Sequence, residues 1–316
     1  MIGSKSRKVV RILVYIALCV VMAVYVYFSH AKYDLRSMHT DLENRSQNSN
    51  VTNTNVDIPI FVINLTRDTE RWAFQDKQRK SLQIPNDLFT RVDAIDGKKL
   101  ILKPGNTNHL DTNEVDIYRY DNTFDVIVDR AFGKHKPSII ACTMSHITAI
   151  KIALHSGAEL AVIAEDDVSW RLSPLWEQSL STLATNISIP RESPFTIELF
   201  SNAWFPRKGL TRDNQIWGAQ AYIVNRDAMK RLLNTVFLGP VGDNTMHLKH
   251  NKTTSNLSAD IYVYDVIGSR WSIEPTYVYP YNCSHTSTLH EIYDITHIWH
   301  AHRSLKRALV SLQTAT

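Results

Sequence analysis

Two short runs of consecutive apolar residues are the features that most limit the possible folds. They are "IPIFVINL" at residues 58–65 and "ELAVIA" at residues 159–164. A strand that is apolar at successive positions is buried on both faces, which is typical of parallel sheets covered by helices on both sides. We therefore expect these runs to be buried strands of a layered α/β domain.

Helical patterns separate the apolar runs. Segment 67–84 has acidic residues in its first turn and basic ones later, as a helix dipole favours, and Thr66 is its expected N-cap. Segment 138–157 has apolar residues at helical spacing and ends at Gly157. Further strands are expected in 88–97, 195–200 and 217–225, and further helices near 173–185 and in 226–239. This alternation predicts an α/β domain with a mostly parallel central sheet.

Residues 12–28 carry no charged side chain, and four basic residues precede them, Lys5, Arg7, Lys8 and Arg11. The arrangement predicts a transmembrane signal anchor whose N-terminus stays in the cytoplasm, because basic flanks remain on that side. A cleaved signal peptide is the alternative, although the apolar run is long for one.

The segment between this anchor and the first strand is polar and rich in Asn, Ser and Thr, a composition typical of a tether. The expected organisation is a cytoplasmic tail (1–11), a transmembrane anchor (12–29), a disordered stem (30–57) and one large domain (58–316). Such a single-pass type II protein would place its domain in the Golgi or endoplasmic reticulum lumen, and a bacterial inner membrane is the alternative. Glycosylation sequons in the stem fit a secretory lumen.

Charge and cysteine content argue against two classes of protein, nucleic-acid-binding proteins and disulfide scaffolds. The chain has 35 basic and 31 acidic residues, and the four basic residues before the anchor account for the difference. The remainder is neutral, so we expect no nucleic-acid partner. Three cysteines are too few for a disulfide scaffold; Cys19 lies in the anchor, and the sequence leaves open whether Cys142 and Cys283 pair.

Three adjacent carboxylates, Glu165, Asp166 and Asp167, end the second apolar run. In open α/β sheets, ligands bind at the carboxyl ends of the strands. Glu165 and Asp167 would share one face of an extended chain, and two carboxylates there suit Mn²⁺ or Mg²⁺ bound together with the phosphates of a nucleotide. A solvated acidic turn that caps the next helix is the alternative.

Six motifs, in their order along the chain, resemble glycosyltransferase family 25. They are "IFVINLTRDTERW", "RVDAIDG", "ACTMSHITAIKIA", "AVIAEDDV", "WGAQAYIVNRDAMKRLL" and "SADIYVYD". The likeness spans roughly residues 58–282. The family includes lipopolysaccharide and collagen β-galactosyltransferases. The resemblance implies a GT-A-like nucleotide-sugar fold, a UDP-sugar donor such as UDP-galactose, a divalent metal, a glycan or glycoprotein acceptor, and hexose transfer with inversion.

The resemblance also implies roles for individual residues. Glu165 and Asp167 would hold the metal. Apart from the resemblance, an inverting transfer needs a general base, for which Asp260 is the first candidate and Asp243 the second, although Asp243 could simply belong to a turn. The residues expected to approach the donor are Asn64, Arg67, Arg71, Asp93, Ala94, Ser145, His146, Asp166, Gly218 and Tyr222.

Several of these residues have a structural alternative. Arg67 and Arg71, at i and i+4, suit a diphosphate, but they equally suit a solvated helix face that pairs with nearby acids. His146 lies among apolar residues, where a histidine is more often a hydrogen-bonded part of the core. Tyr222 has the pattern of a packing aromatic whose hydroxyl reaches the site.

One motif departs from the family pattern. Members commonly read like "GEIGCALSH", whereas this chain reads "SIIACTMSH", with Ser138 and Ile139 in place of glycine and glutamate. The departure motivates a second hypothesis, a catalytically inactive luminal module that binds sugar or protein. A third, a metal-dependent phosphohydrolase, is weakened because "AEDDV" lacks the Asp-x-Asp-x-Thr arrangement of a phosphoryl-accepting nucleophile.

Overall fold

The structure is a computed structural model that describes most of the large domain. The described ranges are 55–103, 115–186 without 122 and 134, 193–200, 209–212, 218–237, 245–250 and 256–280 without 275, with single positions nearer both ends. Asp243, Cys283 and most of the predicted stem lie outside them. Of the predicted anchor, the described positions are helical and exposed: Val14, Tyr15, Leu18, Cys19, Met22 and Val26.

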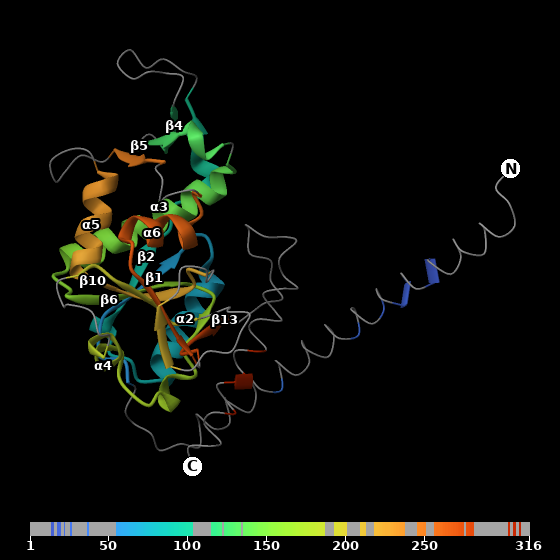
Figure 1. The fold of residues 1–316 in the computed structure, drawn as a ribbon, viewed down its shortest axis with the longest axis vertical. Coiled ribbons are helices and arrows are strands. Elements are labelled where there is room, and N and C mark those ends of the chain that lie inside the picture. Colours follow the sequence, from blue (N-terminus) through green and yellow to red (C-terminus); the bar gives the residue numbers. More distant parts are fainter. Residues whose placement is uncertain are drawn as a thin grey trace, which may run out of the picture.

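A seven-stranded sheet forms the centre of the domain (Figure 1). Its strand order is β2-β1-β6-β10-β8-β12-β9. The strands are β1 (Ile60–Asn64), β2 (Phe89–Asp93), β6 (Leu160–Glu165), β8 (Thr196–Glu198), β9 (Gly209–Arg212), β10 (Ala221–Asn225) and β12 (Arg270–Glu274).

The sheet is mixed, so the expectation of a mostly parallel sheet needs correction. β1 runs parallel to β2 and β6, and β12 runs parallel to β8. β10, however, is antiparallel to both of its neighbours, β6 and β8, and β9 is antiparallel to β12. All five residues of β10 are buried. A central antiparallel strand that is covered on both faces is as uniformly apolar as a parallel one, so composition does not reveal its direction.

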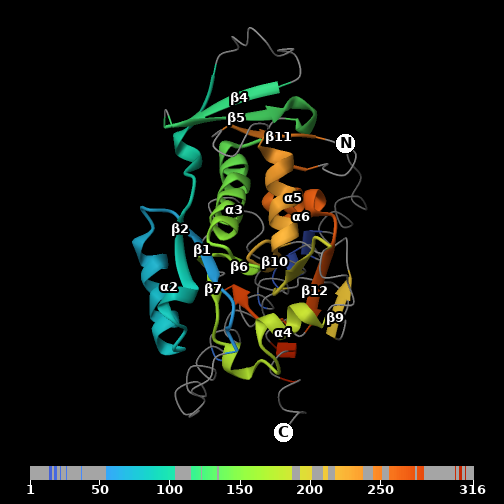
Figure 2. The same cartoon turned by 90° about the vertical axis from the view of Figure 1, so that its left-hand side faces the viewer.

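Helices cover both faces of the sheet (Figures 1 and 2). The helices α3 (Pro137–His155), α5 (Arg226–Val236) and α6 (Ala259–Ile267) contribute to one buried apolar cluster, and α4 (Leu180–Thr185) contributes to the other. Trp72 of α2 (Thr69–Ser81) packs against this second cluster. Strand β1 alternates between the clusters, since Ile60 and Val62 belong to one and their neighbours in the strand to the other. The layered α/β architecture is thus confirmed.

Two predictions about helix ends have different outcomes. Thr66 is not the N-cap of α2; Asp68 is, because its side chain accepts a hydrogen bond from the backbone N–H of Arg71. The stop at Gly157 is confirmed: α3 ends at His155, and Gly157 has φ +86°, a left-handed conformation that favours glycine. Short 3₁₀ turns cover Asn86–Leu88 (η1), Gly97–Lys99 (η2), Arg130–Phe132 (η3) and Ser173–Leu175 (η4).

A second sheet of four strands lies at one end of α3 and α5 (Figure 2). It has the order β11-β5-β4-β3, with β3 (Leu100–Leu102), β4 (Val115–Tyr120), β5 (Phe124–Asp129) and β11 (Met246–Leu248). Strands β7 (Val168–Ser169) and β13 (Tyr279–Pro280) form a third, small sheet.

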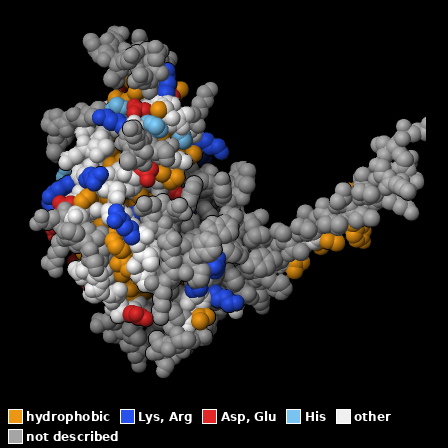
Figure 3. All heavy atoms as spheres, in the orientation of Figure 1, with side chains coloured by type: hydrophobic (Ala, Val, Ile, Leu, Met, Phe, Trp, Pro, Cys, Tyr) orange, Lys and Arg blue, Asp and Glu red, His pale blue; other side chains and the backbone are white. Residues whose placement is uncertain are grey.

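Within the described part of the chain, α3 is the one helix long and apolar enough to cross a membrane. More than half of its most apolar window is buried inside the protein, and it contacts α5, α6, β1 and β6. These contacts are those of a core helix. On the face shown in Figure 3, the described basic and acidic side chains are interspersed with one another and with apolar ones.

Candidate active site

The acidic turn lies at the carboxyl ends of three adjacent parallel strands. Ile63 pairs in register with Glu165, and Asn64 pairs with Asp93, so β1, β2 and β6 end at the same edge of the sheet. Side chains from sequence-distant motifs therefore meet there, as expected for an α/β sheet that binds a ligand at this edge.

Two buried glutamines of α2 hold the turn in place. Gln75 Nε2 donates to the backbone carbonyls of Asp166 (2.9 Å) and Val168 (2.7 Å), and Gln78 Nε2 donates to Val168 (3.0 Å). Trp170 donates its backbone N–H to Gln78 Oε1 (2.9 Å) and its indole N–H to Gln75 Oε1 (3.0 Å). Buried amides that are satisfied in this way fix a backbone rigidly, and this geometry is not that of a solvated bend.

Asp166, the middle carboxylate, is buried and paired inside the protein. It accepts hydrogen bonds from Asn64 Nδ2 (2.6 Å) and from Arg71 Nη1 (2.8 Å). Arg71 also pairs with Asp68 at 3.3 Å. Burial raises the pKa of Asp166, while Arg71 and Asn64 lower it. Asp166 and Arg71 thus form part of the frame of the turn, and their charges compensate each other.

Asp167 presents a buried carboxylate oxygen to the site. Its Oδ1 atom has no hydrogen-bond partner among the described residues. Burial, followed by the neighbouring charges of Glu165 and Asp166, raises the pKa of Asp167 to about 7. A buried oxygen without a donor is costly, and a bound cation would remove that cost. Asp167 therefore fits the metal-ligand role expected from its motif.

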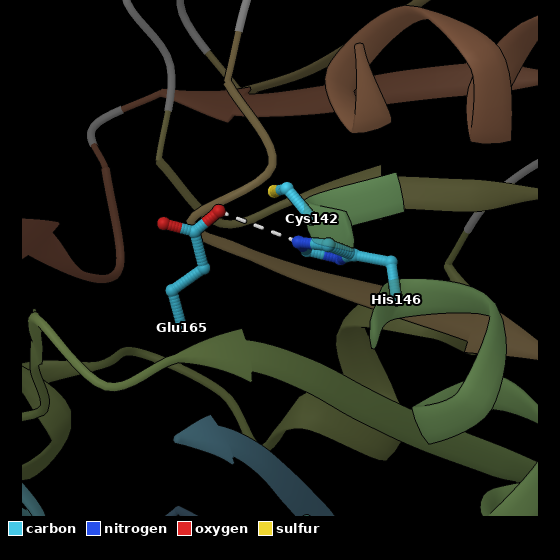
Figure 4. Close-up of side chains that lie close together, drawn as sticks. All are labelled: Cys142, His146 and Glu165. Carbon is cyan, nitrogen blue, oxygen red and sulfur yellow. Dashed lines mark hydrogen bonds and ion pairs between the residues drawn. The ribbon is translucent and has the colours of Figure 1, made fainter. Parts of the chain in front are cut away.

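Glu165 lies beside two residues of α3 (Figure 4). His146 is buried; its Nε2 is 3.3 Å from Glu165 Oε1, and its Nδ1 is 3.1 Å from the hydroxyl of Tyr222. The His146 and Tyr222 rings stack with centroids 5.8 Å apart. Cys142, one helical turn earlier, points its sulfur at the same place, and the ligand atoms of Cys142, His146 and Glu165 all lie within 4.8 Å of one another.

Cys142 is the residue of this group that our sequence analysis did not assign. Its thiol is free, and burial together with the charges of Glu165, Asp260 and Asp167 raises its pKa well above the ordinary range. The i, i+4 spacing of Cys142 and His146 was the available signal, because residues so spaced share one helix face.

The segment before β10 also reaches the acidic turn. Glu165 donates its backbone N–H to the carbonyl of Gln220 (2.8 Å), and Tyr264 donates its hydroxyl proton to the carbonyl of Gly218 (3.0 Å). Gly218 has φ +136°, which side chains disfavour. Tyr222 and Tyr264 meet edge to face at 5.4 Å. The two residues predicted on this segment, Gly218 and Tyr222, are therefore parts of one framework with Glu165.

Asp260 lies in the first turn of α6 and is partly buried. Its carboxylate is near enough to raise the pKa of the Cys142 thiol. Helix α6 is joined to α3 because Thr143 Oγ1 donates to the carbonyl of Leu257. Asp260 thus lies close to the cluster formed by Cys142, His146 and Glu165, whereas Asp243, the second candidate base, is outside the described residues.

A buried ion pair lies in the same region and had not been predicted. Glu198, fully buried at the end of β8, pairs with Arg270 of β12. Glu198 is in register with Tyr222 on β10, and the guanidinium of Arg270 lies 4.1 Å from the centre of the Tyr264 ring. The pair links β8 to β12, which also pair with each other in the sheet.

Four predicted residues lie around the turn after β2. Ala94 donates its backbone N–H to the carbonyl of Asn64 (2.9 Å), and Ser145 Oγ accepts from the backbone N–H of Ile95 (2.8 Å). The Asp93 side chain is exposed and lies 3.4 Å from Thr66 Oγ1.

Arg67 and Gly97 complete this region. The Arg67 side chain is 43% exposed and pairs with Asp96. A Cβ atom on Gly97 would lie 2.7 Å from Ser138 Cα, so glycine is required where the turn after β2 meets the start of α3. Ser145 and Gly97 thus keep this turn in contact with α3.

Comparison with known families adds one finding. The sequence model of glycosyltransferase family 25, described as an LPS biosynthesis protein, matches residues 57–237. The matched range runs from before β1 to the end of α5, and it contains the acidic turn, α3 and the segment from Gly218 to Tyr222. No individually curated protein matches the chain significantly.

Proposed function

This chain belongs to glycosyltransferase family 25, and from this membership we propose that it transfers a hexose from a UDP-sugar to a glycan or glycoprotein acceptor. Galactose is the first candidate for the sugar. We further propose that transfer is assisted by Mn²⁺ or Mg²⁺ and inverts the configuration at the anomeric carbon.

The observation that carries the proposal is the asymmetry of the acidic turn. Asp166 is compensated by Arg71, whereas Asp167 keeps a buried oxygen without a donor and lies next to Glu165. Glu165 and Asp167 would therefore hold the cation through oxygen ligands, which Mn²⁺ and Mg²⁺ accept. When bound, such a cation neutralises the charge of a diphosphate leaving group.

The surrounding residues suit a nucleotide diphosphate. Arg67 is the more exposed of the two predicted arginines, and its planar guanidinium matches phosphate geometry. Arg71 instead secures Asp166, so we assign it a positioning role. Asn64, which has a buried Oδ1 atom without a partner, and Asp93, which is exposed, line the same edge of the sheet.

Inverting transfer also needs a base for the acceptor. We propose that Asp260 accepts the proton of the acceptor hydroxyl as the hydroxyl oxygen bonds to the anomeric carbon. The bond from that carbon to the UDP oxygen breaks at the same time, and UDP leaves from the opposite face. The partial burial of Asp260 and its nearness to Cys142 support this assignment.

We also propose that residues 12–28 anchor the enzyme as a type II membrane protein of the Golgi or endoplasmic reticulum. Basic residues before a charge-free apolar segment support this orientation. Protease treatment of sealed microsomes tests it: the domain should be protected until detergent is added. Degradation of the domain in sealed vesicles would contradict the proposed topology.

A transfer assay tests the enzymatic proposal. Radiolabelled UDP-galactose, UDP-glucose and UDP-N-acetylglucosamine are incubated with the full-length protein, Mn²⁺ and a panel of glycan acceptors. Asp167→Asn should lower turnover by about a hundredfold or more, because it removes charge stabilisation at the leaving group. Asp87→Asn, a change at an exposed carboxylate of η1, is the matched control. Equal turnover of Asp167→Asn and wild type would refute the metal role.

The motif departure at the start of α3 supports a second candidate, a non-catalytic binding module. Ile139 occupies the first turn of α3, one turn before Cys142, where family members commonly have a glutamate. This candidate predicts UDP binding without transfer to any acceptor, and recovery of transfer in Ile139→Glu. Efficient transfer by the wild-type chain would dismiss it.

A further inference from the structure

Three side chains of different chemistry converge beside the proposed metal site. Cys142 and His146 project from one face of α3, Glu165 ends β6, and their ligand atoms lie within 4.8 Å of one another (Figure 4). The ligands of a tetrahedral Zn²⁺ lie about 2.0–2.3 Å from the metal and hence roughly 3–4 Å from one another. Modest side-chain rotations would therefore suffice to bring all three onto one ion.

The orientation of His146 suits this use. Its ring is buried, and Tyr222 contacts Nδ1 at 3.1 Å, so that Nε2 faces Glu165 at 3.3 Å. Histidines that bind metals commonly use the second ring nitrogen to contact a neighbouring polar group, which fixes the ring. The hydroxyl of Tyr222 provides this contact.

The donor atoms favour a different metal from the one proposed for transfer. A thiolate and an imidazole are borderline-soft ligands that select Zn²⁺, whereas Mn²⁺ and Mg²⁺ prefer oxygen. For equal ligands, Zn²⁺ also binds more tightly than Mn²⁺. The Glu165 side chain is 32% exposed, so the cluster is open to solvent on that side, and a fourth position would be available for water.

We propose that Cys142, His146 and Glu165 form a Zn²⁺ site, and that Zn²⁺ bound there withdraws Glu165 from the Mn²⁺ or Mg²⁺ ion of the transfer site and inhibits the enzyme. Binding replaces the thiol proton of Cys142 by the metal and releases that proton to solvent. The inhibition rests on the proposed function, whereas the existence of the site does not.

Cobalt substitution tests the site independently of any activity. The metal-free full-length protein is titrated with Co²⁺, and a thiolate-to-cobalt charge-transfer band in the near ultraviolet should saturate at one ion per chain. Zn²⁺ should displace the band. Cys142→Ser should abolish it, and the matched controls Cys19→Ser and Cys283→Ser should retain it. No band in the wild type, or a band that persists in Cys142→Ser, would overturn the proposal.

Two further variants define the ligand set. His146→Gln should weaken Co²⁺ binding strongly, and Tyr222→Phe, which removes only the hydroxyl, should weaken it about 10- to 100-fold. Unchanged Co²⁺ affinity in His146→Gln would exclude His146 as a ligand and overturn the three-residue site.

The inhibitory effect is measured separately. Micromolar Zn²⁺ should suppress Mn²⁺-dependent transfer by the wild type and leave transfer by Cys142→Ser unaffected. If no transfer is found under any condition, the proposed function fails while the cobalt band still decides the site. If transfer is robust and equally Zn²⁺-sensitive in both proteins, the inhibition does not pass through Cys142, and that part of the inference is wrong.

Discussion

Asn64 Nδ2 donates a 2.6 Å hydrogen bond to Asp166 Oδ2, although 102 residues separate them. This bond joins the end of β1 to the acidic turn after β6, and both groups are buried. Asn64→Ala should lower the free energy of unfolding by about 1–3 kcal/mol, because it leaves a buried carboxylate short of a donor. Urea denaturation measures the loss, and Asn86→Ala, at an exposed position, should be nearly neutral. Equal stabilities would show that the bond contributes nothing.

The hydrogen bonds by which Gln75 and Gln78 of α2 hold the acidic turn, here called the clamp, lead to a related prediction. Gln75→Leu keeps the volume of the side chain but removes donors to Asp166 and Val168 and an acceptor for Trp170. We expect a loss of about 1–3 kcal/mol in stability and weaker Mn²⁺ binding, since the turn would no longer be fixed. Lys77→Leu, at an exposed position of the same helix, is the control. A Gln75→Leu protein with normal Mn²⁺ affinity would show that the turn holds its shape without the clamp.

The raised pKa of Asp167 leads us to expect that the stability of the protein depends on pH. Its pKa is raised from 3.8 to about 7 in the folded protein, so the folded state holds the proton more tightly than the unfolded state. The free energy of unfolding of the metal-free protein should therefore fall as pH rises from about 4 to about 7 and lose no more above that range. Asp167→Asn removes this contribution and should stabilise the metal-free protein at pH 8 by about 4 kcal/mol.

Thermal unfolding measured across this pH range tests whether stability falls as the pH rises. The stability difference between Asp167→Asn and wild type should grow from pH 4 to pH 7, and Asp87→Asn should show no such growth. Added Mn²⁺ at pH 8 should stabilise the wild type but not the Asp167→Asn variant. A difference that is constant with pH would contradict the raised pKa of this carboxylate.

The Glu198–Arg270 pair predicts strong coupling between two strands. Because both side chains are buried, Glu198→Leu or Arg270→Leu alone should cost about 3–5 kcal/mol, and the double variant should cost less than the sum. The exposed pair Glu159–Arg226, 3.5 Å apart, should contribute less than about 1 kcal/mol. Double-mutant cycles in urea give both values, and additive losses at Glu198 and Arg270 would mean that they do not interact.

The helices and strands that could be predicted from the sequence are those with a clear local pattern of apolar residues. β1, β6 and β10 are uninterrupted apolar runs, and α5 has apolar residues on one face and polar residues on the other. In contrast, β4 and β5 are mostly half-buried and mix charged with apolar residues, so neither the alternation of a surface strand nor the run of a buried one stands out. Their pairing depends on contacts made only after the chain has folded.

At the candidate site, too, some features could be predicted from the sequence and others could not. The position of the acidic turn followed from the rule that ligands meet at strand ends, and the structure brings Asn64 beside it. The buried role of Gln75 and Gln78 could not be predicted, because a glutamine in a polar helix usually faces water. The proximity of Cys142 to Glu165 depends on how α3 packs on β6, which no local pattern specifies.

The burial of α3 has a consequence for the order of events during synthesis. By length and composition this helix is apolar enough to cross a membrane, yet α5 and α6, the helices that pack against it, come later in the chain. A nascent domain that has been synthesised only as far as β6 would therefore have the apolar surface of α3 uncovered. Apolar surface that stays exposed until α5 and α6 have been made favours aggregation of the incomplete domain.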